Sequence, residues 1–70
     1  MSWRDEFTDL LLKEGYITED EKICLMNNNE ATVDGRELRI ASGPDYYLYV
    51  DDDFCIKFDC RRGKWEVYDI

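Results

Sequence analysis

The chain has 70 residues, 17 of them acidic and nine basic, and its net charge at neutral pH is −8. A chain of this length buries only about 60% of its unfolded surface, which allows one thin core and leaves little material to wall off an active site. The acidic balance argues against direct binding of DNA or RNA and against anionic membranes, because contacts to phosphates require clustered Lys and Arg side chains.

A first helix is predicted over residues 3–14. Ser2 is a helix N-cap with acids in the turn that follows it, and Gly15 gives a C-terminal stop. Leu12 lies off the apolar face and needs cover from another element, or else stays exposed. The apolar face recurs at helical spacing and comprises Trp3, Phe7, Leu10 and Leu11.

A second, shorter helix is predicted to run to about Asn27. Thr18 and Glu21 have the spacing of a capping box, and the helix would place Ile23 and Met26 on one face. A strand over residues 23–26 is the alternative, because periodicity cannot decide so short an apolar run. Residues 2–28 would then form a helical hairpin.

From Glu30 onward the apolar pattern changes to a period of two, which predicts an antiparallel β-meander over residues 30–69. The first turn is Asp34-Gly35, a two-residue hairpin signal. Closing this turn gives the pairs Val33–Arg36, Ala31–Leu38 and Glu30–Arg39. The apolar pair then lies on one face and the Glu–Arg pair on the other, which supports the register.

The next hairpin is predicted to turn at Asp51-Asp52-Asp53, and a three-residue loop there sends every apolar residue of the two strands to one face. The resulting pairs are Val50–Phe54, Leu48–Ile56 and Tyr46–Phe58. For the last hairpin an even-length loop is expected. Its register sets Cys60 against Trp65, Phe58 against Val67 and Lys57 against Tyr68.

These elements predict one acidic α+β domain over residues 1–70, with one or two N-terminal helices packed on one face of a four- to five-stranded antiparallel β-meander. The apolar helix face would cover the core face of the sheet. That core face is expected to comprise Leu38, Ile40, Tyr46, Leu48, Val50, Phe54, Ile56, Phe58, Trp65 and Val67.

The residues needed for catalysis and for metal binding are scarce. There is no His, and an odd number of cysteines without a C-x-x-C pair argues against a disulfide framework or a zinc site. Asp51-Asp52-Asp53 lacks the spaced oxygen ligands of a calcium loop. We therefore expect no enzyme activity, no metal and no cofactor. No signal peptide or membrane-spanning run is predicted, and a reducing cytoplasm fits the cysteine usage best.

The three cysteines are expected in different places. Cys60 is predicted to point into the core beside Trp65, and Cys24 to be buried on the second helix. Cys55 falls on the outer face of the sheet and is the candidate reactive thiol. An inert thiol is the favoured interpretation there, because no neighbour that would stabilise a thiolate is evident.

Two surfaces remain as candidate binding sites. Two helices can cover only one face of the sheet, so the other face would carry Tyr47, Tyr49 and Tyr68 around Lys57, and tyrosines are enriched in protein–protein interfaces. Cross-strand tyrosine pairs can also simply stabilise an open sheet face. The candidate acidic residues are Asp5, Glu6 and Asp9 of the first helix and Asp45, Asp51, Asp52 and Asp53 of the sheet's loops.

These features predict a non-enzymatic binding protein, an inhibitor whose carboxylates imitate phosphates and occupy a basic nucleic-acid-binding surface of another protein. In type the chain resembles small acidic bacteriophage inhibitors, including anti-CRISPR proteins, although no motif matches a particular family. The alternatives are an antitoxin- or immunity-type binder and a self-associating module that uses the tyrosine face or a sheet edge. A monomer or weak homodimer is expected.

Overall fold

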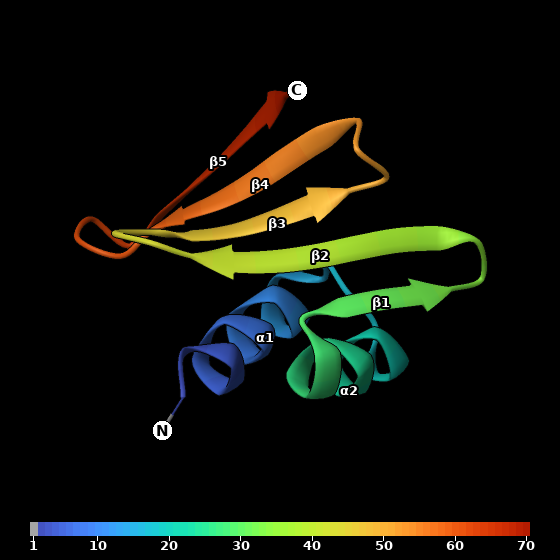
Figure 1. The fold of residues 1–70 in the computed structure, drawn as a ribbon. Coiled ribbons are helices and arrows are strands. Elements are labelled where there is room, and N and C mark those ends of the chain that lie inside the picture. Colours follow the sequence, from blue (N-terminus) through green and yellow to red (C-terminus); the bar gives the residue numbers. More distant parts are fainter. Residues whose placement is uncertain (1) are drawn as a thin grey trace.

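A computed structural model describes residues 2–70, and in it two helices pack on one face of a five-stranded antiparallel sheet (Figure 1). The strands lie in the sheet in the same order as in the chain, so the predicted α+β meander is confirmed. The elements are α1 (Trp3–Glu14), α2 (Glu19–Asn28), β1 (Glu30–Val33), β2 (Arg36–Ser42), β3 (Tyr46–Val50), β4 (Phe54–Asp59) and β5 (Lys64–Asp69).

Both helices begin where their caps predict, and α1 also ends at its predicted stop. The Ser2 hydroxyl accepts the backbone N–H of Asp5 at 3.4 Å, and Gly15 ends α1 in the left-handed conformation with φ 81°. Thr18 and Glu21 form a complete capping box at the start of α2. The helix over the second segment is therefore confirmed, and the alternative of a strand over residues 23–26 is wrong.

The buried face of α2 differs from the prediction. Leu25 and Glu21 face the core, whereas Ile23 is 57% exposed and Met26 is only half-buried. Glu21 and Leu25 are four residues apart and so lie one above the other on the helix. Glu21 can be buried there because its carboxylate accepts the Thr18 N–H at 2.8 Å and lies 3.4 Å from the Arg36 guanidinium.

The first two predicted hairpin registers are confirmed. Asp34 and Gly35 both take positive φ values, 53° and 79°, as a two-residue hairpin turn between right-twisted strands requires. The loop over 51–53 joins β3 to β4 with Leu48 opposite Ile56, as predicted.

The predicted register of the last hairpin is wrong by two residues. The loop has the expected even length, but its four residues are 60–63, so Phe58 pairs with Trp65 and Lys57 with Glu66. The Asp59 carboxylate accepts the N–H groups of Arg61 and Arg62 at 3.0 and 3.1 Å, which closes the turn one residue earlier than expected. Cys60 therefore leaves the ladder and is exposed, contrary to its predicted place in the core.

The core lies between the helices and strands β1 to β4. Leu12, which is off the predicted helix face, packs against this core, whereas Leu10 is only half-buried. Val67 shares the helix-facing side of the sheet but is 56% exposed, so its predicted burial is wrong. The fully or nearly fully buried apolar residues are Phe7, Leu11, Ile17, Leu25, Ala31, Leu38, Ile40, Leu48, Val50 and Ile56.

The reason for the exposure of Val67 is the reach of the helical layer. The two helices lie beneath the β1 and β2 side of the sheet, and the sheet twists so that β5 rises away from them (Figure 1). Within residues 2–70, neither helix is long and apolar enough to cross a membrane.

Candidate docking surfaces

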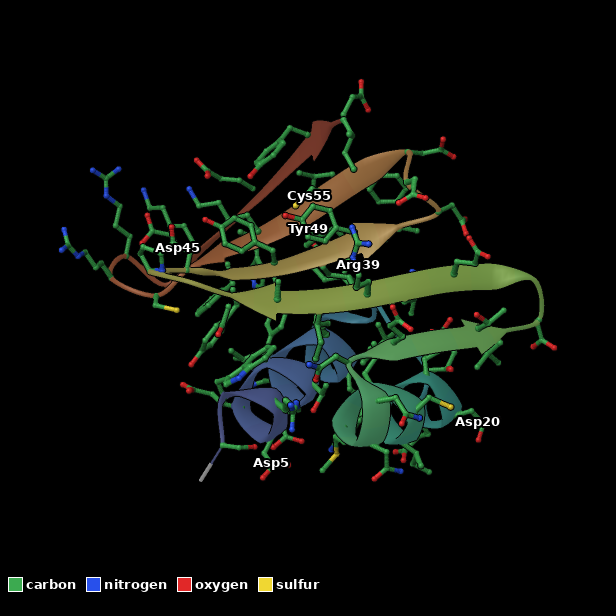
Figure 2. The ribbon with its side chains drawn as sticks, in the orientation of Figure 1. Asp5, Asp20, Arg39, Asp45, Tyr49 and Cys55 are labelled. Atoms are coloured by element: carbon green, nitrogen blue, oxygen red, sulfur yellow. The ribbon has the colours of Figure 1, made fainter. Side chains whose placement is uncertain are left out.

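The outer face of the sheet, which no helix covers, carries the predicted tyrosines. Tyr47 and Tyr49 project from β3 with their rings stacked at a centroid distance of 6.4 Å. The Arg39 guanidinium lies 5.1 Å from the centroid of the Tyr49 ring, where the negative ring face attracts it (Figure 2). Tyr68 stands on β5 opposite Cys55, rather than opposite Lys57 as predicted.

Cys55 lies on this outer face as expected, yet it is only 2% exposed. Tyr49 of β3 and Tyr68 of β5 are its cross-strand partners, so the thiol lies between aromatic side chains. Burial raises the pKa of the Cys55 thiol. The favoured interpretation of an inert thiol is therefore supported, because the thiolate is the nucleophilic form.

Lys57 lies at the centre of an ion-pair network on the same face. Its Nζ atom is 3.4 Å from the Asp45 carboxylate and 3.3 Å from the Glu66 carboxylate. The hydrogen bond to Glu66 is the main reason that the pKa of Lys57 is raised. Asp45 also accepts the Cys60 N–H at 3.3 Å, so this predicted binding residue holds two loops together.

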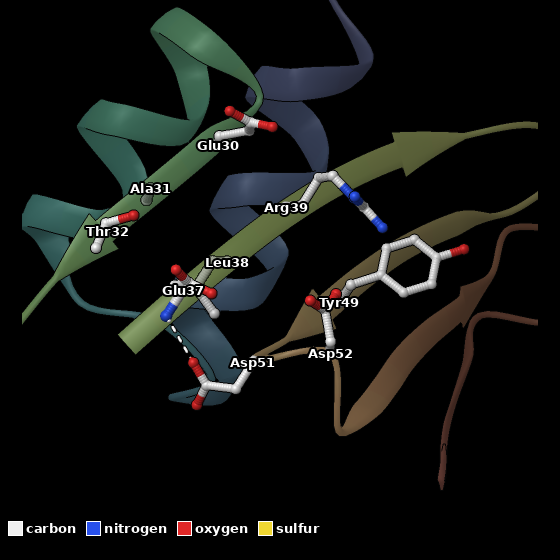
Figure 3. Close-up of a pocket in the computed structure, with 9 residues that line it drawn as sticks. All are labelled: Glu30, Ala31, Thr32, Glu37, Leu38, Arg39, Tyr49, Asp51 and Asp52. Atoms are coloured by element: carbon white, nitrogen blue, oxygen red, sulfur yellow. Dashed lines mark hydrogen bonds between the residues drawn. The ribbon is translucent and has the colours of Figure 1, made fainter. Parts of the chain in front are cut away.

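A shallow groove of about 200 Å³ crosses the outer face of β1, β2 and the 51–53 loop (Figure 3). Four carboxylates and one guanidinium line it, and the ring of Tyr49 forms part of its wall. The charged residues are Glu30, Glu37, Arg39, Asp51 and Asp52. A groove with this balance of charge and an aromatic wall suits a cationic side chain.

Sequence reasoning missed this groove as a site. The signal was present in the first hairpin, since its register places Glu30 beside Arg39 on the outer face. The approach of the 51–53 loop to Glu37 could not be derived from pairing within one hairpin.

The three aspartates of the 51–53 loop have different roles. Asp51 extends the β2–β3 ladder, because its carboxylate accepts the Glu37 N–H at 2.7 Å and its own N–H donates to the Glu37 carbonyl at 2.8 Å. Asp51 and Asp52 both have positive φ, a conformation that Asp tolerates better than most residues. Among residues 2–70, no side-chain hydrogen bond or ion pair engages Asp52 or Asp53.

The predicted acids of α1 are partly engaged within the fold. The Tyr46 hydroxyl donates to the Glu6 carboxylate at 2.8 Å, and this bond is the main reason that the pKa of Tyr46 is raised to about 12. Asp9 forms an ion pair with Lys22 of α2. Asp5 lies in the first turn of α1, at the helix end where carboxylates are stabilising (Figure 2).

The tip of the β4–β5 hairpin is basic and was not predicted as a surface of its own. Arg61, Arg62 and Lys64 are all exposed there, beside the exposed thiol of Cys60. Residues 54–70 contain four bases and three acids, whereas residues 2–53 contain 14 acids and five bases. The charge of the molecule is therefore strongly asymmetric.

Residues 2–70 contain no group of three Cys, Asp or Glu side chains arranged to hold a metal ion. Comparisons of the chain with protein-family models, with curated proteins and with solved structures find no match.

Proposed function

We propose that this chain is a non-enzymatic inhibitor that binds a basic, nucleic-acid-binding surface of another protein. The observation that carries the proposal is the state of its carboxylates. Ion pairs and side-chain hydrogen bonds among residues 2–70 engage seven of the 17 acids, so the other ten carboxylates are available to a partner. Unpaired carboxylates attract a basic surface over several ångströms and increase the association rate.

The position of these acids on regular elements supports imitation of a phosphate backbone. The turns at 34–35 and 51–53 lie at the same end of the meander, since successive hairpins alternate ends. This acidic end of the sheet, defined by Asp34, Glu37, Asp51, Asp52 and Asp53, is held by backbone and side-chain hydrogen bonds of the loop. A rigid arrangement loses little conformational entropy when it binds.

The groove beside the acidic end supplies a place for an anchor. Its carboxylates would receive a lysine or arginine side chain of the partner, and the Tyr49 ring would pack against the alkyl stem. In this account the acids steer association, while Tyr47 and Tyr49 contribute the packed contact that slows dissociation.

The first experiment maps the surface with a defined probe. An oligolysine peptide is titrated into the ¹⁵N-labelled chain, and amide chemical shifts are followed. We expect the largest shifts around Glu37, Tyr49 and Asp52, and little change at Arg61 and Arg62. Shifts that are largest on α1, or equal everywhere, would contradict the proposed site.

The second experiment uses variants of equal charge change on a partner captured from the native cell or its host. Asp52→Asn with Asp53→Asn removes two unengaged acids of the acidic end. The matched control, Glu14→Gln with Asp20→Asn, removes two exposed acids of the helices. Association should slow more in the loop variant. Equal slowing would mean that only net charge matters.

Asp51 is left intact in these variants because it supports the β2–β3 ladder. Tyr47→Ala with Tyr49→Ala tests the anchor separately. If the tyrosines form a packed hot spot, this variant loses more than about 2 kcal/mol of binding free energy, mainly through faster dissociation.

A further inference from the structure

Strand β5 is the edge of the sheet that the rest of the fold covers least. Among residues 2–70 it has β4 on one side and no strand on the other. The helices lie beneath the opposite half of the sheet (Figure 1), and only Trp65 at the start of β5 packs against aromatic rings of the helical hairpin, those of Phe7 and Tyr16. The other edge, β1, has only four residues and continues directly from α2. On β5 the side chain of Val67 is exposed although it lies on the helix-facing side.

The hydrogen-bond pattern shows which backbone groups of β5 point to the open edge. In the β4–β5 ladder Phe54 lies opposite Asp69, so the next pair is Asp53 and Ile70. The Ile70 N–H donates to the Asp53 carbonyl at 3.1 Å, which makes this a hydrogen-bonded pair. Hydrogen-bonded pairs alternate along an antiparallel ladder, so the even-numbered residues of β5 bond β4. The N–H and C=O groups of Trp65, Val67 and Asp69 therefore face outward.

This alternation restricts how a second copy can pair with β5. In an antiparallel pair the outward-facing residues of both strands must lie opposite one another. Odd-numbered residues then face odd-numbered residues, and the helices of both copies lie on the same side of one continuous sheet. The rotation axis must be perpendicular to the sheet, as in a two-fold dimer.

Counted over residues 64–70, three such registers pair five or more residues of one copy with the other copy. Centring the pair on Glu66 would set two carboxylates directly opposite each other, which is destabilising. Centring it on Tyr68 would set each exposed Val67 side chain opposite the Asp69 carboxylate of the other copy. Centring it on Val67 sets the two exposed Val67 side chains against each other, with Trp65 of each copy opposite Asp69 of the other.

The charges along β5 favour the same arrangement. An antiparallel pair centred on Val67 brings Lys64 of one copy opposite Ile70 of the other, on the outer face and beside Asp53, whose carbonyl accepts the Ile70 N–H. Because residues 54–70 contain one more base than acid, this edge is also where two chains of charge −8 repel each other least.

From these observations we infer that β5 pairs with β5 of a second copy, centred on Val67, to form a ten-stranded sheet. The contact is independent of the proposed inhibitor function, since the groove lies across β1 and β2 at the opposite edge of the sheet. Of the acidic end, only Asp53 lies beside β5, through its carbonyl bond to the Ile70 N–H. Asp69, a charge on the helix-facing side of an edge strand, opposes tight edge pairing and keeps the association weak.

The test is a pair of variants that each add one cysteine to the edge, both in a Cys60→Ser background so that the exposed native thiol is absent. Half-buried Cys24 and buried Cys55 remain in both variants and affect them equally. In the dimer the two Val67→Cys residues form a hydrogen-bonded pair with Cα atoms about 5.5 Å apart, a distance that a disulfide spans. Glu66→Cys is the matched control, because residue 66 faces residue 68 of the other copy.

At about 100 µM protein, pre-association raises the effective thiol concentration to the millimolar range, so Val67→Cys should form a disulfide dimer about tenfold faster than Glu66→Cys. Equal rates would indicate random collision and overturn the proposal. A parent chain that sediments as a monomer at every concentration up to 1 mM, an order-of-magnitude bound on weak association, would also overturn it.

A third variant separates pairing from folding. Val67→Lys places two like charges at the centre of the pair, while the exposed position leaves the monomer folded, as circular dichroism would verify. Loss of the dimer in this variant supports the proposed contact. A dimer as strong as that of the parent would place the contact elsewhere and overturn the proposal.

Discussion

Glu21 should be the most informative single position for the stability of the fold, because its buried carboxylate joins three segments. It is 3% exposed, it accepts the Thr18 N–H at the start of α2, and it lies beside Arg36 of β2. Arg36 in turn donates to the Tyr16 carbonyl at 2.7 Å, in the turn between the helices. The link therefore fastens the helical hairpin to the sheet.

We expect Glu21→Ala to lower the free energy of unfolding by about 2 kcal/mol. The substitution removes one buried methylene group, the Cγ, which contributes about 0.8 kcal/mol, and the lost acceptor of the Thr18 N–H adds about 1 kcal/mol. The Arg36 pair adds little, because the Arg36 side chain is 36% exposed and water weakens the attraction, as in surface pairs of about 0–1 kcal/mol.

Glu21→Gln is the matched control, since it keeps both methylene groups and an oxygen that can accept the Thr18 N–H. It should cost about 1 kcal/mol or less, the range of an exposed ion pair. Urea denaturation followed by tryptophan fluorescence measures both values. Equal losses in the two variants would refute the reasoning, because they would mean that charge attraction to Arg36 dominates.

Three further outcomes are expected. Phe7→Ala should cost about 3–5 kcal/mol, the range for a fully buried phenyl group, and half-buried Phe58→Ala should cost clearly less; a reversal in urea denaturation would contradict the burial pattern. Tyr46 should ionise near pH 12 in an ultraviolet titration. Because its pKa is raised in the folded state, its contribution to stability is complete below about pH 10, the ordinary tyrosine pKa, and is lost between there and pH 12. Ionisation near pH 10 would contradict the hydrogen bond to α1. A thiol reagent should label exposed Cys60 rapidly and buried Cys55 only on unfolding, which mass spectrometry of a labelling time course would check.

Much of the fold follows from local signals in the sequence. The caps at Ser2 and Thr18 predict both helix starts, and the Asp34-Gly35 turn predicts the register of its hairpin. These signals succeed because a cap or a two-residue turn fixes the backbone with residues that are adjacent in sequence.

The errors arise where a side-chain hydrogen bond or ion pair decides the structure. The last hairpin closes at Asp59 because its carboxylate binds two backbone N–H groups of the loop, a contact that alternation of apolar residues does not reveal. The buried face of α2 is likewise set by Arg36, which approaches Glu21 from the sheet. Apolar counting favours Ile23 over a carboxylate, and tertiary pairing reverses that choice.

The candidate site was predictable only in part. Because side chains alternate between the two faces of a strand, the sequence of β3 places Tyr47 and Tyr49 on the outer face, as the structure has them. The engagement of Asp45 by Lys57 and of Glu6 by Tyr46 depends on side-chain reach across elements. Sequence reasoning treated all these acids alike, whereas the fold uses some of them and leaves Asp52 and Asp53 to the solvent.

The most direct test of the proposed function is a competition for the captured partner. The complex is titrated with an oligonucleotide that the partner binds, at constant ionic strength, and the release of the chain is measured; the affinity is then measured again across a range of salt concentrations. We predict that nucleic acid and chain exclude one another and that affinity falls steeply as salt rises. A ternary complex, or an affinity that salt leaves unchanged, would contradict binding to a basic nucleic-acid surface.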